Sequence, residues 1–358
     1  MGIRQMRHGH IIGRLIVAAC ALLIVLPAGA DWMQAVAYYK QGQYEKAIQE
    51  LKPDLDKNPD WEFGHRLAGL CYLALKNNAL AIFELTRAVQ LQSKAFATYQ
   101  ALAQAYFNTD KLENCIQTLS QGDPFAKEPN DLYALRHMRG AAYYRLQKYD
   151  QAVEDLTAAI RIKPTDWVDF SQLGVAYYNL DRYDDATQAL QKALTLKPGD
   201  NVTTQFLGKT FFKQGVTALT EKQYSQAADL FRKAANYNPS DGYVYYNAGE
   251  AHLFSNNYAE AEKAYNQAQV LLPRNATIFQ RLGFLYEKQK KWDQAEKAYN
   301  QSLTLLPHTA EIYQRLGIIY EEQKKWDKAL GAYQKANEIN PSQALKDAIA
   351  RVTEIKKL

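Results

Sequence analysis

The stretch from Ala276 to Gln343 constrains the fold of this chain more than any other, because it contains one 34-residue segment twice. The two copies are ATIFQRLGFLYEKQKKWDQAEKAYNQSLTLLPHT and AEIYQRLGIIYEEQKKWDKALGAYQKANEINPSQ, and seventeen of their columns are identical. Both hold Leu-Gly-x2-Tyr, then Ala-x3-Tyr, then Pro at fixed offsets. Repetition at this period is typical of a solenoid, in which each repeat packs only on its neighbours.

The same template matches seven earlier segments of the chain. The nine repeats cover residues 28–61, 62–95, 96–132, 133–166, 167–200, 208–241, 242–275, 276–309 and 310–343. Position 8 of the repeat is always Gly or Ala, position 20 is Ala in every repeat except the third, and position 24 is always Leu, Phe or Tyr. Pro stands at position 32 in seven repeats. The pattern therefore extends over almost the whole chain.

These columns predict a pair of antiparallel helices in each repeat, which we call helix A and helix B. Small residues at positions 8 and 20 allow the two backbones to approach, and larger residues at positions 4, 7, 11 and 24 fill the space around that contact. Pro at position 32 ends helix B. Asp166, Asp200 and Asp241 follow two residues later and are predicted to cap the next helix A. Stacking then completes the apolar face of each hairpin.

The columns resemble the tetratricopeptide repeat (TPR), whose W-x2-L-G-x2-Y…A-x3-F…P pattern they match. The resemblance covers residues 31–343 and implies an all-α, right-handed α-solenoid of about nine TPR helical hairpins. Beyond it, residues 344–358 form one apolar stripe with a charged opposite face, which predicts a C-terminal capping helix. The stripe consists of Leu345, Ile349, Val352 and Ile355.

Two segments depart from the regular period. The third repeat is three residues longer, and Gln121-Gly122-Asp123-Pro124 ends its helix B early, so a bent loop is expected before Tyr133. Residues 201–207 are a seven-residue insertion without a helix breaker. Seven residues are about two helical turns, so we expect helix A of the sixth repeat to be extended. The register of residues 201–241 stays open by those two turns.

Residues 1–30 have the three-part layout of a secretory signal peptide. A leader with three arginines is followed by the apolar run 15–26 and by the small residues Ala28-Gly29-Ala30. The apolar run is shorter than the roughly 20 residues that a membrane-spanning helix needs. We therefore expect export and cleavage, with a periplasmic protein in a bacterium that has an outer membrane. The alternatives are an uncleaved membrane anchor and a lipoprotein signal ending at Cys20.

No catalytic, cofactor-binding or metal-binding signature stands out. The formal net charge is +5 from 43 basic and 38 acidic residues, which favours neither nucleic acid nor another polyanion as a partner. Gly208-Lys209-Thr210 lacks the first glycine of a phosphate-binding loop, where Thr203 stands instead. The histidines are far apart in sequence and lack ligand spacing. Export would permit a disulfide between Cys71 and Cys115, but Cys115 fills the small position 20, which favours a packed free thiol.

In the TPR family, positions 2, 5, 9, 12 and 13 of helix A line the concave inner face, so the resemblance implies that a partner binds there. These positions are largely apolar or aromatic through seven repeats and become acidic near Glu287, Glu311, Glu321 and Glu322. An exposed apolar surface of this extent is typical of a binding groove. Because Tyr is common at positions 5 and 12 in the family, packing is the alternative role. The predicted groove residues are Trp32, Tyr39, Phe107, Tyr144, Arg145, Tyr178, Phe212, Tyr246 and Phe254.

These observations favour a non-catalytic TPR scaffold of the cell envelope that holds an extended segment or a helix of a protein partner during assembly of an envelope complex. The alternatives are a TPR component of an exopolysaccharide synthesis or secretion machine and a co-chaperone-like adaptor. The near-neutral charge gives no support for an acidic glycan ligand. A two-carboxylate clamp for chaperone tails is disfavoured, because only two of its five slots are basic. Those slots are His137, Ala141, Gln172, Lys209 and Lys213.

Overall fold

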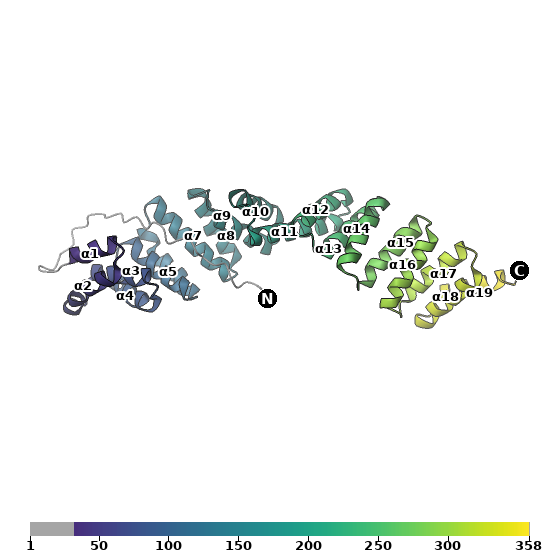
Figure 1. Cartoon of the computed structure of the whole chain (residues 1–358), viewed down its shortest axis with the longest axis horizontal. Coiled ribbons are helices and arrows are strands. Elements are labelled where there is room, and N and C mark those ends of the chain that lie inside the picture. The colour runs from purple at the N-terminus through teal and green to yellow at the C-terminus, as the bar shows by residue number, and fades with distance from the viewer. Residues whose placement is uncertain (1–31, 358) are drawn as a thin grey trace. The chain divides into compact units, whose positions relative to one another are not determined.

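The computed structural model describes residues 32–357, which contain nineteen α-helices, one short 3-10 helix and no strand. The predicted signal peptide, residues 1–30, lies outside the described residues. The chain divides between Ser93 and Lys94 into two compact parts, which are described separately. The N-terminal part holds two helical hairpins (Figure 1). Its helices are α1 (Trp32–Lys40), α2 (Tyr44–Lys57), α3 (Glu62–Ala74) and α4 (Asn78–Gln90).

The C-terminal part holds seven further hairpins and a last single helix (Figure 1). Each A helix packs on the B helix that follows it, and each B helix packs on the first helix of the next repeat. The expected all-α solenoid of about nine helical hairpins with a C-terminal capping helix is confirmed. The helices are α5 (Phe96–Asn108), α6 (Leu112–Gly122), η1 (Asp123–Phe125), α7 (Pro129–Arg145), α8 (Tyr149–Ile162), α9 (Trp167–Asn179), α10 (Tyr183–Leu196), α11 (Asn201–Thr220), α12 (Tyr224–Tyr237), α13 (Gly242–Phe254), α14 (Tyr258–Leu271), α15 (Ala276–Lys288), α16 (Trp292–Leu305), α17 (Ala310–Glu322), α18 (Trp326–Ile339) and α19 (Gln343–Ile355).

The glycine at position 8 of helix A lies directly against the side chain at position 24 of helix B. A Cβ atom on Gly174 would lie 2.5 Å from Cγ of Leu190 and 3.1 Å from its backbone nitrogen. A Cβ atom on Gly283 would likewise lie 2.5 Å from the ring of Tyr299. Leu190 and Tyr299 are both fully buried, and burying a leucine side chain contributes about 2 kcal/mol to stability. The two most regular columns of the repeat thus form one contact that fixes each hairpin.

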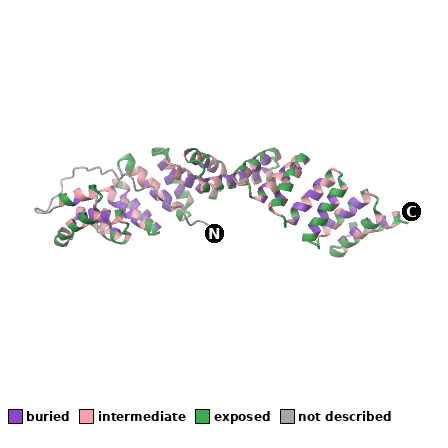
Figure 2. Cartoon of the chain, in the orientation of Figure 1, coloured by how far each residue is buried: buried purple, intermediate pink, exposed green. Residues whose placement is uncertain are grey.

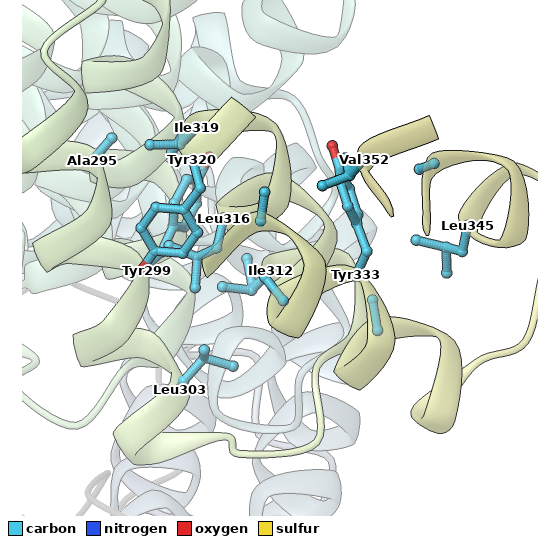
Figure 3. Close-up of a cluster of buried hydrophobic side chains, with 14 residues drawn as sticks. Ala295, Tyr299, Leu303, Ile312, Leu316, Ile319, Tyr320, Tyr333, Leu345 and Val352 are labelled. Carbon is cyan, nitrogen blue, oxygen red and sulfur yellow. The ribbon is translucent and has the colours of Figure 1, made fainter. Parts of the chain in front are cut away.

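The core runs through the hairpins as a series of clusters. Figure 2 shows buried residues within the helix pairs and exposed residues at many of the turns. In the last cluster, Tyr299 of α16 packs with Leu316 and Tyr320 of α17, and Tyr333 of α18 lies beside Val352 of α19 (Figure 3). The outer face of α19 is exposed and polar at Lys346, Asp347 and Glu354, among others. This arrangement is the capping helix that the apolar stripe predicts.

The structure shows how the two irregular segments fold. Helix α6 ends at Gly122 as expected, but the following residues form a 3-10 turn and α7 begins at Pro129, four residues before Tyr133. The expected loop is therefore short, because Pro is well suited to the first position of a helix. The insertion at 201–207 extends α11 to twenty residues, as predicted. Gly215 packs on Phe231, so the regular register holds in the sixth repeat.

Two features recur at helix ends in the described residues. Asp166, Asp200 and Asp241 each accept a hydrogen bond from a backbone N–H of the helix that they precede, as predicted. The turn between helix A and helix B has a left-handed residue at position 15 in every repeat, with φ from 56° to 74°. These residues are Gly42, Lys76, Asp110, Gln147, Asp181, Lys222, Asn256, Lys290 and Lys324. Only the first is glycine, so eight repeats hold a strained backbone at this turn.

Both cysteines in the described part of the chain are free and buried. Burial raises the pKa of the Cys71 thiol and of the Cys115 thiol to about 12. Each thiol therefore stays protonated and packs as a small apolar group, in line with the favoured interpretation of Cys115. Among the described helices, none has both the length and the apolar character needed to cross a membrane.

Candidate partner-binding surface

The predicted groove residues all lie on A helices, but most of them are only partly accessible. Seven are half-buried, and only Arg145 and Phe254 are exposed. The half-buried residues are Trp32, Tyr39, Phe107, Tyr144, Tyr178, Phe212 and Tyr246. A side chain of this kind can contact a partner with one edge while the other edge packs inside the protein. Both roles that the sequence leaves open are therefore combined in the same rings.

In the N-terminal part, the two candidates contact other aromatic rings. Trp32 of α1 meets Phe63 of α3 edge to face, with ring centroids 5.7 Å apart. Tyr39 of α1 meets Tyr44 of α2 in the same way, also at 5.7 Å. Burial raises the pKa of Tyr39, with smaller contributions from Cys71 and Tyr44. These contacts hold α1 on the hairpin that follows and on its own helix B.

Arg145 and Phe107 engage each other across neighbouring repeats. The Arg145 guanidinium lies over the Phe107 ring, 4.8 Å from its centroid, and donates a hydrogen bond of 2.6 Å to Oδ1 of Asp110. Cation–π contacts at exposed sites contribute about 0.5–1 kcal/mol. Arg145 therefore links α7 to the end of α5, and the outer surface of this pair is what remains for a partner.

The aromatic candidates of α9, α11 and α13 belong partly to the core. Tyr178 meets Phe206 edge to face at 5.4 Å, and Phe212 packs on the buried Phe231 at 5.7 Å. Burial raises the pKa of Tyr178, and the same cause raises that of Tyr144. Alanine at any of these positions would remove packing together with any partner contact.

Helix α13 carries the most accessible aromatic groups of the surface. Tyr243 is 54% exposed and Phe254 is 48% exposed. They stand eleven residues apart, which is about three turns, so they share one face of the helix. Phe254 also stacks on Tyr224 of α12 at 5.5 Å. Tyr243 was not among the predicted groove residues, although it occupies position 2, which the family pattern places on the inner face.

At the end of the surface that the sequence predicts to be acidic, two of the four glutamates, Glu287 and Glu321, take part in internal bridges. Glu287 of α15 accepts a hydrogen bond of 2.9 Å from the Tyr299 hydroxyl and pairs with Arg315 of α17 at 3.3 Å. Glu321 likewise accepts from Tyr333 at 2.5 Å and pairs with Arg351 of α19 at 2.9 Å. Glu287 and Glu321 are therefore not free acidic groups for a partner.

A third bridge of the same kind lies one repeat earlier. Glu250 of α13 is buried, accepts from the Tyr265 hydroxyl and pairs with Arg281 of α15 at 3.0 Å. Burial raises the pKa of Glu250, while Tyr265 and Arg281 act in the opposite direction. In all three bridges the tyrosine is the position-24 residue that packs on the repeat glycine. Only the spacing Gly-x15-Tyr marks them in the sequence, and it does not show the partners.

A buried carboxylate joins α7 to α8 in the fourth repeat. Asp155 is 2% exposed and accepts hydrogen bonds from Arg139 at 2.7 and 2.9 Å and from Arg136 at 2.7 Å. The pKa of Arg139 is raised, first by its hydrogen bond to Asp155. Arg139 also donates to Ser120 of α6 at 3.3 Å. This cluster was not predicted from the sequence, because its members come from three different helices.

Two sets of polar side chains lie on or next to A helices of the C-terminal part. Lys209 and Thr210 lie inside α11, and the Thr210 hydroxyl donates to the carbonyl of Phe206 at 2.7 Å, so no phosphate-binding loop forms here. The described residues do bring together one group of side chains that could hold a metal ion, His137, Asp166 and Asp169. This group was not predicted from the sequence.

Comparisons with known proteins agree on the repeat. Five tetratricopeptide repeat models match residues 32–99, 134–166, 170–200, 218–282 and 274–342. Residues 100–133, which include most of the irregular third repeat, fall between two of these matches. No curated protein matches the chain.

Solved structures of other proteins are similar at low identity. YrrB, described as a TPR protein with an unusual peptide-binding site, is 20% identical over 58% of this chain and 100% of its own, with a TM-score of 0.42. The C-terminal part of a TPR repeat-containing protein from Cytophaga hutchinsonii is 15% identical over 79% of this chain and 98% of its own, with a TM-score of 0.45. MamA from Desulfovibrio magneticus RS-1 is 22% identical over 49% of this chain and 96% of its own, with a TM-score of 0.36.

The assignment rests on the repeat models and on the hairpins themselves. The models reach from residue 32 to residue 342, with gaps at 100–133, 167–169 and 201–217. The glycine contact, the left-handed turn and the helix caps recur in the same columns that the models match. The chain belongs to the tetratricopeptide repeat family.

Proposed function

We propose that this protein is a non-catalytic scaffold of the cell envelope that binds an extended segment or a helix of a protein partner along its A helices. Membership of the tetratricopeptide repeat family supports the role of a protein-interaction scaffold. Within the C-terminal part, the exposed aromatic face of α13 carries the proposal, because Tyr243 and Phe254 are the large aromatic side chains that its A helices leave exposed. Large aromatic side chains are frequent anchors in protein interfaces.

The surroundings of α13 suit a peptide or a helix rather than a small molecule. Between the two aromatic groups, the Asn247 side chain is held by a hydrogen bond of 2.8 Å to the carbonyl of Tyr243, and its carboxamide can still accept a hydrogen bond. Glu250 beneath them is occupied by Tyr265 and Arg281. The surface therefore offers two apolar anchors and neutral hydrogen-bonding groups. It has no free charge of its own that would select a strongly ionic ligand.

Crosslinking in the envelope tests the surface. The double variant Tyr243→Ala/Phe254→Ala is expected to reduce partner capture at least tenfold, because each aromatic anchor contributes about 2 kcal/mol when it is central to an interface. Both side chains are accessible, so these substitutions disturb packing less than changes at Tyr144, Tyr178 or Tyr246. Val270→Ala is the matched control, because Val270 is 73% exposed but lies on helix B, in α14. Equal capture by the double variant and the wild type would move the binding surface elsewhere.

The envelope location rests on residues 1–30 alone and has its own test. Fused to a reporter that is active only after export, these residues are expected to direct the reporter across the inner membrane. A second fusion, in which the chain begins at Asp31, is the matched control and is expected to stay inside the cell. An inactive reporter on residues 1–30 would remove the envelope assignment while leaving the scaffold role in place.

A further inference from the structure

Helices α7 and α9 bring three metal-capable side chains together on neighbouring repeats. His137 of α7 contacts Asp169 of α9, with 2.6 Å between Nδ1 and Oδ1. Asp166, the N-cap of α9, completes the group, and one donor atom from each residue lies within 4.8 Å of the other two. Tyr133, one turn before His137, donates its hydroxyl hydrogen to Oδ2 of Asp166 at 2.8 Å. The separation of His137 from Asp169 is 32 residues, so spacing rules along the chain do not detect the group.

The buried carboxylate of Asp169 is the second observation. Its side chain has no exposed surface, and its Oδ2 atom has no hydrogen-bond partner within the described part of the chain. The single hydroxyl hydrogen of Tyr133 is already given to Asp166. A buried polar atom without a partner costs about 1–3 kcal/mol, and more when it is charged. An electropositive group beside Asp169 would remove that cost.

The charges around the group leave room for a cation. Lys163 pairs with Asp166, with Nζ 3.7 Å from Oδ2. Half of the Lys163 side chain is exposed, so it can turn toward solvent. A metal ion binds the deprotonated imidazole of His137. In that form two carboxylates face one ammonium group, and the net charge of the group is negative. A divalent ion would compensate both carboxylates, whereas the half-exposed Lys163 pairs with Asp166.

We propose that His137, Asp166 and Asp169 form a binding site for a divalent transition-metal ion, with Zn²⁺ as its best-suited occupant. One imidazole nitrogen and two carboxylate oxygens are ligands that Zn²⁺ accepts at about 2.0–2.2 Å. Binding would require the His137–Asp169 distance to widen from 2.6 Å to about 3.3 Å, the separation of two ligands in a tetrahedral site. Tyr133 holds the Asp166 carboxylate in place through its hydrogen bond, and water molecules would complete the coordination. The ion would tie α7 to α9 whether or not the proposed partner binds.

Calorimetric titration of the metal-free full-length chain with ZnCl₂ tests the site. We expect one ion per chain and a rise in the thermal unfolding midpoint when zinc is in excess. His137→Gln is expected to abolish this binding, and Asp166→Asn to weaken it at least tenfold. Asn is as good an N-cap as Asp, so the second variant keeps the start of α9 intact. If His137→Gln does not fold, as judged by its circular dichroism spectrum, Asp166→Asn tests the metal site by itself.

His65 provides the matched control. Its Nδ1 atom lies 2.6 Å from Oε2 of Glu84, and its Nε2 atom lies 2.9 Å from the carbonyl of Pro59. His65 therefore has one carboxylate partner, but among the described residues it does not belong to a group of three metal-capable side chains. His65→Gln is expected to leave zinc binding unchanged. The exposed His308 serves as a control for adventitious binding, and His308→Gln is also expected to have no effect. Stoichiometric zinc binding that survives Asp166→Asn, or that falls equally with His65→Gln, would overturn the site.

Discussion

Gly174→Ala is expected to lower the free energy of unfolding by about 2 kcal/mol, although alanine is the better helix former. In an open helical position the same change raises stability by about 1 kcal/mol. At Gly174 the new methyl group would lie 2.5 Å from Cγ of Leu190 and 3.1 Å from its backbone nitrogen. Because a backbone atom cannot move aside as a side chain can, α9 and α10 would have to separate. The loss is measured as a lower midpoint of urea unfolding, followed by circular dichroism.

Gly331 offers the matched control within the same fold. It lies inside α18, and a Cβ atom there would meet nothing within 4 Å. Gly331→Ala is therefore expected to raise the unfolding midpoint. The two substitutions are chemically identical and differ only in what faces the new methyl group. A stabilising effect at both positions would contradict the close contact between positions 8 and 24.

Asp155→Ala is expected to destabilise the protein by about 3 kcal/mol. Asp155 is 2% exposed and accepts three hydrogen bonds from Arg136 and Arg139. Without it, two partly buried guanidinium groups lose their principal carboxylate, and desolvation of these charges is no longer offset. The lost bonds also join α7 to α8, so the fourth hairpin loosens. Chemical denaturation of the full chain measures the effect.

An exposed pair in the same part of the chain isolates the contribution of burial. Asp229 and Arg232 are 3.1 Å apart on α12, and both side chains are 67% exposed. Exposed pairs of this kind contribute about 0–1 kcal/mol, so Asp229→Ala is expected to leave the unfolding midpoint nearly unchanged. If Asp155→Ala and Asp229→Ala had equal effects, the buried cluster would not be a structural centre of the fourth repeat.

The hairpins and their closest contact could be predicted from the sequence because they recur. Each repeat gives an independent view of the same packing, and a small residue at position 8 opposite a large one at position 24 is repeated in every copy. The extended α11 could be predicted for a related reason. Seven residues add about two turns, and an insertion of that length leaves Gly215 on the face where the repeat requires it.

The candidate sites could be predicted only in outline. Column positions place Tyr178 or Glu287 on a face of helix A, but they do not show which side chain from the next repeat reaches it. Glu287 has the position of an exposed acidic residue, yet Arg315 and Tyr299 occupy it. The repeat pattern predicts which face of each helix carries apolar side chains. It does not predict the surroundings of charged residues such as Asp155 and Asp169. Contacts between single members of different repeats leave no periodic signal.

The three tyrosine–glutamate–arginine bridges affect how the C-terminal hairpins lose their structure. Each glutamate accepts a hydrogen bond from a tyrosine of its own hairpin and pairs with an arginine of the helix that follows this hairpin. Glu321, for example, binds Tyr333 and Arg351. In a one-dimensional stack, stability divides into a contribution from each hairpin and a coupling between neighbours. The bridges strengthen the coupling, because unfolding of one hairpin removes the arginine that pairs with the glutamate of the preceding hairpin. The helices from α13 to α19 should therefore melt as one cooperative segment rather than fray one by one from the C-terminal end.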